Sequence, residues 1–125
     1  MAKKLHFYRC PVCHSMVDLV NDEGHSLHCC ETEMQLMKPK NAEQSDAYHE
    51  IVLTHRGTLL YVKIGSKPHP QSEEHCITTI FLVTKNDTLR HDIRKGTPAA
   101  TVFTDIEHGD VYAYCNVHGL FKTSF

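Results

Sequence analysis

The sequence predicts an all-β protein in which a small metal-binding unit precedes an antiparallel β-sandwich. Three observations lead to this prediction. Four of the six cysteines lie within residues 10–30, and clustered cysteines in a chain without an export signal favour metal binding over disulfides. From residue 51 onward, short runs rich in β-branched and aromatic residues alternate with glycine, proline and asparagine turns. No segment shows the apolar stripe of an amphipathic helix.

Composition limits the classes of function. Hydrophobic residues make up 41% of the 125 residues and charged residues 22%, which is typical of a folded domain. A net charge of −2 gives no reason to expect nucleic acid or an anionic membrane as a partner. No apolar run approaches the ~20 residues that cross a bilayer, and the N-terminus lacks the apolar centre of a signal peptide. We therefore expect a cytoplasmic protein.

The first structural unit is predicted around two cysteine pairs. A strand-like run, residues 5–9, leads into Cys10-Pro11-Val12-Cys13, and residues 16–20 form a second expected strand. The C-x-x-C spacing allows both sulfurs to face one metal, and Cys29-Cys30 would complete a four-sulfur site. Four thiolates bind iron and zinc alike, so a zinc knuckle without redox activity is one alternative. A disulfide between the adjacent cysteines is another.

A polar connector, residues 38–46, separates this unit from the rest of the chain. It contains one proline and shows no hydrophobic periodicity. The preceding unit, residues 1–37, is too short to bury enough apolar surface by itself, so we expect a metal to hold it together.

The second predicted domain, residues 47–125, consists of short strands. The turn Arg56-Gly57 separates the first two, and Lys85-Asn86-Asp87 closes a long β-branched run. Six or seven strands at this spacing are typical of an antiparallel sandwich. The expected strands are residues 51–55, 58–65, 76–84, 88–93, 99–104, 111–115 and 120–123.

Four histidines and one cysteine of this domain are candidate ligands of a second metal. They are His49, His69, His75, Cys115 and His118. His69 stands between Pro68 and Pro70, whose fixed φ holds the loop before any metal arrives. A single histidine is more often a surface or packing residue, but the set beside a cysteine favours a metal. Five ligands leave one side of an octahedron open, which indicates chemistry on a small ligand.

On these residues, the chain resembles the desulfoferrodoxins, the two-iron form of superoxide reductase. The resemblance covers nearly the full length of the chain. It is most specific at Cys10-Pro11-Val12-Cys13 with Cys29-Cys30, at His69-Pro70 with Glu74-His75, and at residues 114–120. It implies a small rubredoxin-like domain followed by an immunoglobulin-like β-sandwich, usually as a homodimer.

The resemblance also implies two iron sites. Cys10, Cys13, Cys29 and Cys30 would hold a desulforedoxin-like iron. His49, His69, His75 and His118 would surround a second, non-haem iron, with the thiolate of Cys115 below their plane. The implied reaction at this ferrous centre is the one-electron reduction of superoxide to hydrogen peroxide. An external donor such as rubredoxin then returns the electron.

One departure from the family pattern concerns the residues before the first ligand histidine. The family usually has Glu-Lys there, whereas this chain has Ala47-Tyr48. Because the family's lysine attracts the anionic substrate, Lys67 is the candidate replacement, and Tyr48 offers a hydroxyl. A solvated loop lysine is the alternative interpretation of Lys67. Glu74 is a candidate to orient a ligand imidazole, as outer-shell carboxylates do, or a solvated loop acid.

A second departure follows each cysteine pair. His14 and Glu31 replace the glycines that are common at these positions in the family. Glycine tolerates positive φ, so the replacements predict a strained backbone at both turns.

Two rival functions stay open. With the family's lysine absent, both irons could serve electron transfer without efficient superoxide turnover. With zinc in place of iron, the chain would be an interaction module without redox activity. A visible spectrum distinguishes zinc from iron, and superoxide kinetics distinguish the enzyme from the electron carrier.

Overall fold

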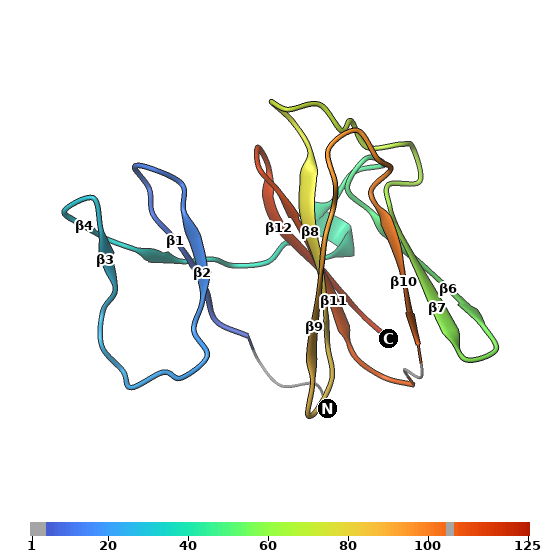
Figure 1. Ribbon diagram of the computed structural model, residues 1–125, viewed down its shortest axis with the longest axis horizontal. Helices are drawn as coiled ribbons and strands as arrows, with labels where there is room; N and C mark the ends of the chain where they lie inside the picture. Colours follow the sequence, from blue (N-terminus) through green and yellow to red (C-terminus); the bar gives the residue numbers. More distant parts are fainter. Residues whose placement is uncertain (1–4, 105–106) are drawn as a thin grey trace. The chain divides into compact units, whose positions relative to one another are not determined.

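The computed structural model describes residues 5–104 and 107–125 (Figure 1). The first four residues of the predicted domain 1–37 therefore lie outside the described part. Contacts divide the described chain into two units, with the boundary between Lys38 and Pro39. Both units are built from β-strands, as predicted, and the one helix among the described residues is a short 3-10 turn. No helix in this part of the chain is long and apolar enough to cross a membrane.

The described residues of the N-terminal unit form five short strands. They are β1 (Phe7–Arg9), β2 (Met16–Asp18), β3 (His28–Cys29), β4 (Thr32–Glu33) and β5 (Gln35–Leu36). Three of them form an antiparallel sheet in the order β2-β1-β5, and β3 pairs with β4 as a hairpin. The first cysteine pair follows β1, and the second lies in the β3–β4 hairpin.

The apolar core of this unit is very small. Among its described residues, the buried hydrophobic side chains are Phe7, Cys10 and Met34. Burial of one large side chain stabilises a fold by about 1.5–3 kcal/mol, whereas ordering each residue costs about 1–2 kcal/mol of backbone entropy. So small a core cannot offset the ordering of the whole unit, and metal binding has to supply the difference.

The second unit is a two-layer antiparallel sandwich. Its strands are β6 (Ile51–Arg56), β7 (Leu59–Ile64), β8 (Ile77–Val83), β9 (Thr88–Asp92), β10 (Ala100–Thr104), β11 (Asp110–Cys115) and β12 (Gly119–Ser124). One sheet has the order β10-β7-β6 and the other the order β12-β11-β8-β9. Figure 1 shows these two sheets as separate layers. The strands expected from the sequence are confirmed to within two residues at their ends.

The core of the sandwich forms between the two sheets. On β7, Leu60, Val62 and Ile64 are buried while the residues between them face outward, which is the alternation that a strand with one buried face requires. On the central strand β11, Val111 and Cys115 belong to the same buried cluster. The thiol of Cys115 therefore projects from the interior, at the last residue of a strand that is paired on both sides.

The segment that leads into the sandwich is ordered against β12. The backbone N–H of Lys40 donates to the Leu120 carbonyl (2.8 Å), and the N–H of Lys122 donates to the Lys40 carbonyl (2.9 Å). The 3-10 helix η1 (Ala42–Gln44) follows, capped by Asn41, whose side chain accepts from two backbone N–H groups. The sequence did not predict this helix, because its one turn lies in a polar stretch without periodicity.

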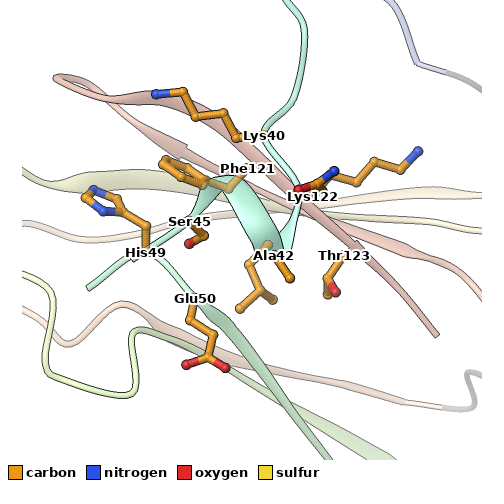
Figure 2. A pocket seen from close by; sticks show the side chains of 10 residues that line it. Lys40, Ala42, Ser45, His49, Glu50, Phe121, Lys122 and Thr123 are labelled. Carbon is orange, nitrogen blue, oxygen red and sulfur yellow. The ribbon is translucent and has the colours of Figure 1, made fainter. Parts of the chain in front are cut away.

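A cavity of about 140 Å³ lies between η1, the start of β6 and β12, beside His49 (Figure 2). The side chains of Lys40 and Lys122 border it, but Figure 2 shows both ammonium groups directed away from its interior. The Lys122 ammonium instead lies 3.7 Å from the Asp110 carboxylate. The cavity therefore presents no cation to a ligand, and it is not a candidate anion site.

Candidate metal centres

The first candidate centre consists of the four N-terminal cysteines. The sulfur atoms of Cys10, Cys13, Cys29 and Cys30 all lie within 4.8 Å of one another. Two of these separations are 3.6 Å, between Cys13 and Cys29, and 3.8 Å, between Cys29 and Cys30. A tetrahedral metal with bonds of ~2.3 Å to sulfur needs ligands about 3.8 Å apart. The four sulfurs fit such a metal with little rearrangement.

The backbone around these cysteines is strained where the sequence predicted it. His14 has φ 65° and Glu31 has φ 58°, and Cys30 also has a positive φ of 53°. A non-glycine residue in this region costs of order 1–3 kcal/mol unless its surroundings hold it there. In the first turn, the N–H of His14 donates to the Cys10 carbonyl (3.0 Å), and the N–H of Cys13 lies 3.5 Å from the Cys10 sulfur. Metal binding to the sulfurs would supply the remaining constraint.

The thiols of this cluster cannot all ionise by themselves. The Ser15 hydroxyl, 3.1 Å from the sulfur of Cys13, lowers the pKa of that thiol to about 6. The neighbouring sulfurs of Cys13 and Cys10 raise the pKa of Cys29 to about 12. Opposite shifts within one cluster mean that the first thiolates formed oppose ionisation of the others. A metal cation resolves this conflict, because it binds all four as thiolates.

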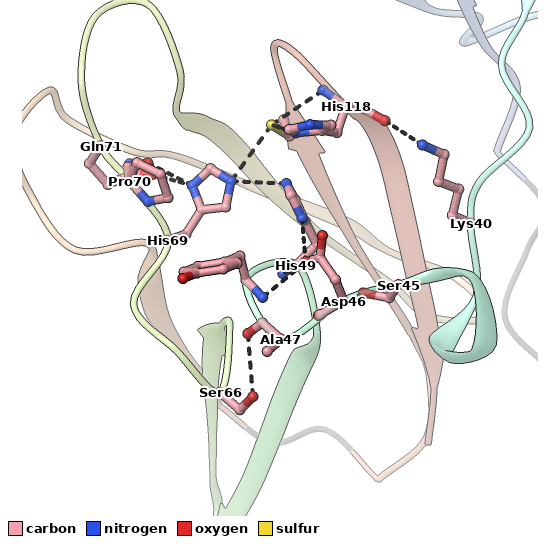
Figure 3. A network of polar contacts seen from close by, with 12 residues as sticks. Lys40, Ser45, Asp46, Ala47, His49, Ser66, His69, Pro70, Gln71 and His118 are labelled. Atoms are coloured by element: carbon pink, nitrogen blue, oxygen red, sulfur yellow. Dashed lines mark hydrogen bonds and ion pairs between the residues drawn. The ribbon is translucent and has the colours of Figure 1, made fainter.

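The second candidate centre gathers the five ligands that the sequence predicted. Donor atoms of His49, His69, His75 and Cys115 lie within 4.8 Å of one another. They come from the turn before β6, the loop after β7, the approach to β8 and the end of β11. His118 adjoins them: its Nδ1 is 3.6 Å from the Cys115 sulfur, and its ring centroid is 4.6 Å from that of His49. Figure 3 shows the rings of His49, His69 and His118 around this point.

Two of the imidazoles are held in one tautomer. Nδ1 of His49 lies 2.7 Å from a carboxylate oxygen of Asp46, and Nδ1 of His69 lies 2.6 Å from the Pro70 carbonyl oxygen. Because both oxygens only accept, both Nδ1 atoms carry the proton. In the neutral ring, Nε2 is then the atom with the lone pair, and the two Nε2 atoms are only 3.1 Å apart. Two facing lone pairs repel each other unless a cation lies against them.

A third imidazole nitrogen supports the same conclusion. Nε2 of His75 is buried and has no hydrogen-bond partner among the described residues, a condition that costs about 1–3 kcal/mol if it persists. Burial also lowers the pKa of His69, which favours the neutral form that binds metals. The donor set therefore fits a metal that prefers imidazole and thiolate, such as iron.

The thiolate form of Cys115 would need a cation beside it. Burial raises its pKa, although the backbone N–H of His118 points at the sulfur from 3.4 Å. A metal would stabilise the thiolate in this apolar position, as coordination deprotonates thiols. The Lys40 ammonium is a further positive charge nearby and donates to the His118 carbonyl (2.9 Å).

Several residues around the centre were not predicted from the sequence. Asp46 binds the outer nitrogen of His49, and the Phe121 ring stacks on His49 at 4.7 Å and 13°. Gln71 exchanges two hydrogen bonds with the backbone of Ile77 (2.9 and 3.1 Å). The sequence held one signal for the role of Asp46: it lies three residues before a ligand histidine and ahead of a strand. Aspartate often closes such a turn through its side chain.

Asn116 joins two of the ligand segments. Its side chain accepts from the N–H of Cys76 (2.9 Å) and donates to the Glu74 carbonyl (3.1 Å). It thereby holds the residues on both sides of His75 against the turn that follows Cys115. Glu74 contributes its backbone to this arrangement, and the carboxylate that orients a ligand belongs to Asp46 instead.

Tyr48 and Lys67, the predicted catalytic residues, lie at neighbouring positions. Both side chains are exposed, that of Tyr48 to 46%. The backbone N–H of Lys67 donates to the Ala47 carbonyl (3.0 Å), and the Ser66 hydroxyl donates to the same oxygen (3.3 Å). The loop that carries Lys67 is therefore fixed to the stretch in which the family usually has Glu-Lys. A catalytic role of either residue stays a prediction.

The fold and the two ligand clusters define a two-centre metalloprotein, with a cysteine-ligated N-terminal unit and a His/Cys site on a β-sandwich. The sequence-family model of the desulfoferrodoxin N-terminal domain matches residues 2–37, and that of desulfoferrodoxin matches residues 50–124. This chain belongs to the desulfoferrodoxin family. A desulfoferrodoxin homolog of Archaeoglobus fulgidus is 32% identical over 124 residues, which are 98% of this chain and 99% of the relative. The desulfoferrodoxin of Syntrophotalea carbinolica is 30% identical over 124 residues, 98% of each chain.

Solved structures agree with the fold. The superoxide reductase of Treponema pallidum superposes with a TM-score of 0.77 at 20% identity, over 96% of this chain and 98% of that one. The one-iron superoxide reductase of Giardia intestinalis gives a TM-score of 0.54 at 21% identity, over 64% of this chain and 98% of that one. The likeness to the first of these structures extends over nearly all of the chain.

Proposed function

We propose that this protein is a superoxide reductase, which reduces superoxide to hydrogen peroxide at an iron bound by His49, His69, His75, His118 and Cys115. One observation carries the proposal. The Nε2 atoms of His49 and His69 face each other, and the Nε2 atom of His75, which has no hydrogen-bond partner among the described residues, lies with them beside the buried thiol of Cys115. The family of the chain and the superoxide reductases that share its fold support the same activity.

The balanced reaction takes one electron and two protons for each superoxide and yields one hydrogen peroxide. Iron bound at this centre would supply the electron and a binding position for superoxide. The residues of the chain supply the rest. Asp46 and Pro70 hold the proton of two ligand rings on Nδ1, so that Nε2 is the atom left to bind the metal, and Phe121 covers one face of the His49 ring against water.

The capture of the anion is proposed to depend on Lys67, with Tyr48 as a hydroxyl donor at the same place. The hydrogen bond from Lys67 to Ala47 supports this role, because it fixes the start of the lysine side chain two residues from His69. A cation beside the substrate path raises the local concentration of an anion and its rate of binding.

The cysteine centre is proposed to hold a second iron in the domain of residues 1–37, joined by the linker 38–46 to the catalytic domain 47–125. An external donor, such as a rubredoxin, would return the electron after each turnover. We further propose a homodimer that acts in the cytoplasm and removes superoxide there.

Pulse radiolysis tests the activity directly. Protein with ferrous iron in the His/Cys centre is mixed with superoxide, and we expect rapid bimolecular oxidation with one hydrogen peroxide formed per site and no dioxygen. Protein loaded with zinc is the control, because zinc cannot supply an electron. A ferrous protein that accepts and donates electrons but does not react with superoxide would be an electron carrier, and the proposal would be wrong.

A further inference from the structure

One carboxylate oxygen of Asp46 accepts three hydrogen bonds within a single turn. The donors are Nδ1 of His49 (2.7 Å), the backbone N–H of His49 (3.0 Å) and the backbone N–H of Tyr48 (2.9 Å). The Asp46 carbonyl also accepts from the N–H of Glu50 (3.0 Å). Asp46 thus fixes both the backbone and the ring of His49, as the dashed lines of Figure 3 show for the ring.

The contact to the ring goes beyond what a turn cap needs. A cap satisfies backbone N–H groups, whereas the shortest of the three bonds here goes to the imidazole. The side chain of Asp46 is 62% exposed while that of His49 is 3% exposed. Water therefore keeps the carboxylate charged, and the ring that it contacts carries the effect of that charge into the buried centre.

The two fixed imidazoles differ in the group that accepts their outer proton. For His69 the acceptor is the neutral carbonyl of Pro70, but for His49 it is an anion. An anionic acceptor draws the proton away from the ring, which makes the other nitrogen more basic and a stronger donor to a metal. The gain is larger for a ferric ion than for a ferrous one, because the ferric ion carries the higher charge.

We propose that Asp46 is a positioning residue that sets the reduction potential of the His/Cys iron by acting through His49. The negative charge of Asp46 stabilises the ferric state and holds the potential below the value that the five ligands alone would give. This inference rests on the proposed function in one respect, namely that iron occupies the centre. The effect on metal affinity does not depend on superoxide chemistry.

Asp46→Asn is the main test, because the amide oxygen can still accept from the ring and the backbone while the charge is gone. We expect the ratio of ferric to ferrous affinity to fall about tenfold in the variant. This change raises the midpoint potential by about 60 mV for a one-electron couple. Spectroelectrochemical titration of the iron-loaded protein measures this shift. Zinc affinity, measured by competition with a chelator, is expected to fall 10–100-fold.

Glu50→Gln is the matched control, since it removes a charge one residue after His49 without touching the ring. We expect its potential to stay near that of the wild type. Equal shifts in the two variants would show a general field effect and overturn the proposal. The proposal would also be wrong if Asp46→Asn kept the potential and the zinc affinity of the wild type while Asp46→Ala lost zinc affinity. Asp46 would then act only as a turn cap.

The two proposals can fail separately. If the wild-type protein binds iron but does not react with superoxide, the proposed function is wrong, and the potentials still decide the role of Asp46. If superoxide is reduced and the Asp46→Asn potential and zinc affinity equal those of the wild type, the role of Asp46 is wrong.

Discussion

At the scale of single residues, the His/Cys centre depends on side chains that do not bind metal themselves. Gln71 and Asn116 each make two hydrogen bonds to backbone, and these bonds fasten the segments of His69 and His75 to the sandwich. Asp46 does the same for the segment of His49. The ligands are therefore positioned before the metal arrives, which lowers the entropy lost on binding.

The Asn116→Ala variant tests this positioning. It leaves the Cys76 N–H and the Glu74 carbonyl without their partner, at a cost of about 1–3 kcal/mol, and it loosens the segment of His75. We expect a lower unfolding midpoint in denaturant and a lower affinity for zinc at the second centre. Asn86→Ala, in the β8–β9 turn, is the control. Wild-type stability and affinity in Asn116→Ala would show that the segment is held by other contacts.

Lys67→Met tests the cation at the substrate path. The change keeps the length of the side chain and the backbone hydrogen bond to Ala47. We expect the second-order rate with superoxide to fall about threefold at low salt and to depend less on ionic strength, because an attractive charge is lost. Lys85→Met, in the β8–β9 turn, should change neither quantity. The same rate and salt dependence in Lys67→Met as in the wild type would count against the role of Lys67.

At the scale of elements, the loop after β7 is shaped by a glycine at which a side chain cannot fit. Gly65 has φ +94°, and a Cβ there would lie 2.2 Å from the Lys67 carbonyl oxygen and 2.8 Å from that of Tyr48. Both neighbours are backbone atoms and cannot move aside without shifting the loop. The absence of a side chain therefore allows the stretches of Tyr48 and Lys67 to approach.

Gly65→Ala should destabilise the protein by about 3 kcal/mol or more, because it adds a steric clash to the cost of the positive φ. Gly57→Ala, in the β6–β7 hairpin, is a matched control: its φ is +60°, but nothing lies within 4 Å of the added carbon. We expect Gly57→Ala to cost about 1–2 kcal/mol. Equal losses in the two variants, measured by denaturant unfolding, would show that the clash is relieved without cost.

The elements also show what sequence reasoning can reach. The strands were predictable because each shows a local alternation or a β-branched run that needs no knowledge of its partners. The nine ligands were predictable from spacing and from the family pattern. The pairing of Lys40 with β12 was not, because its hydrogen-bond partners lie about eighty residues along the chain. The helix η1 was not, because its single turn shows no hydrophobic periodicity. The contact of Asp46 with the His49 ring depends on side-chain geometry that a turn signal does not specify.

At the scale of the whole molecule, the two units are stabilised in different ways. The sandwich has a continuous core between two sheets, whereas the N-terminal unit has three buried hydrophobic residues among those described. The first unit therefore depends on its metal for folding, whereas the second has a core large enough to fold without one.

Metal removal should separate the two units. After treatment with a chelator, we expect fast amide hydrogen exchange throughout residues 5–38, while the strands of the sandwich keep their protection and their cooperative thermal transition. Nuclear magnetic resonance measures both regions in one sample. Retained protection in the N-terminal unit without metal would show that its small core is sufficient. Return of protection on adding zinc or iron is the control for irreversible damage.

The position of Cys115 has a consequence for how the centre loses iron. This ligand is the last residue of a strand paired on both sides, and its sulfur belongs to the core, so it moves only when the sandwich itself opens. His118 lies three residues farther on, in an exposed turn. Release of iron should therefore begin with dissociation of His118, and a protein that is slowly losing iron would keep its thiolate bond to the end.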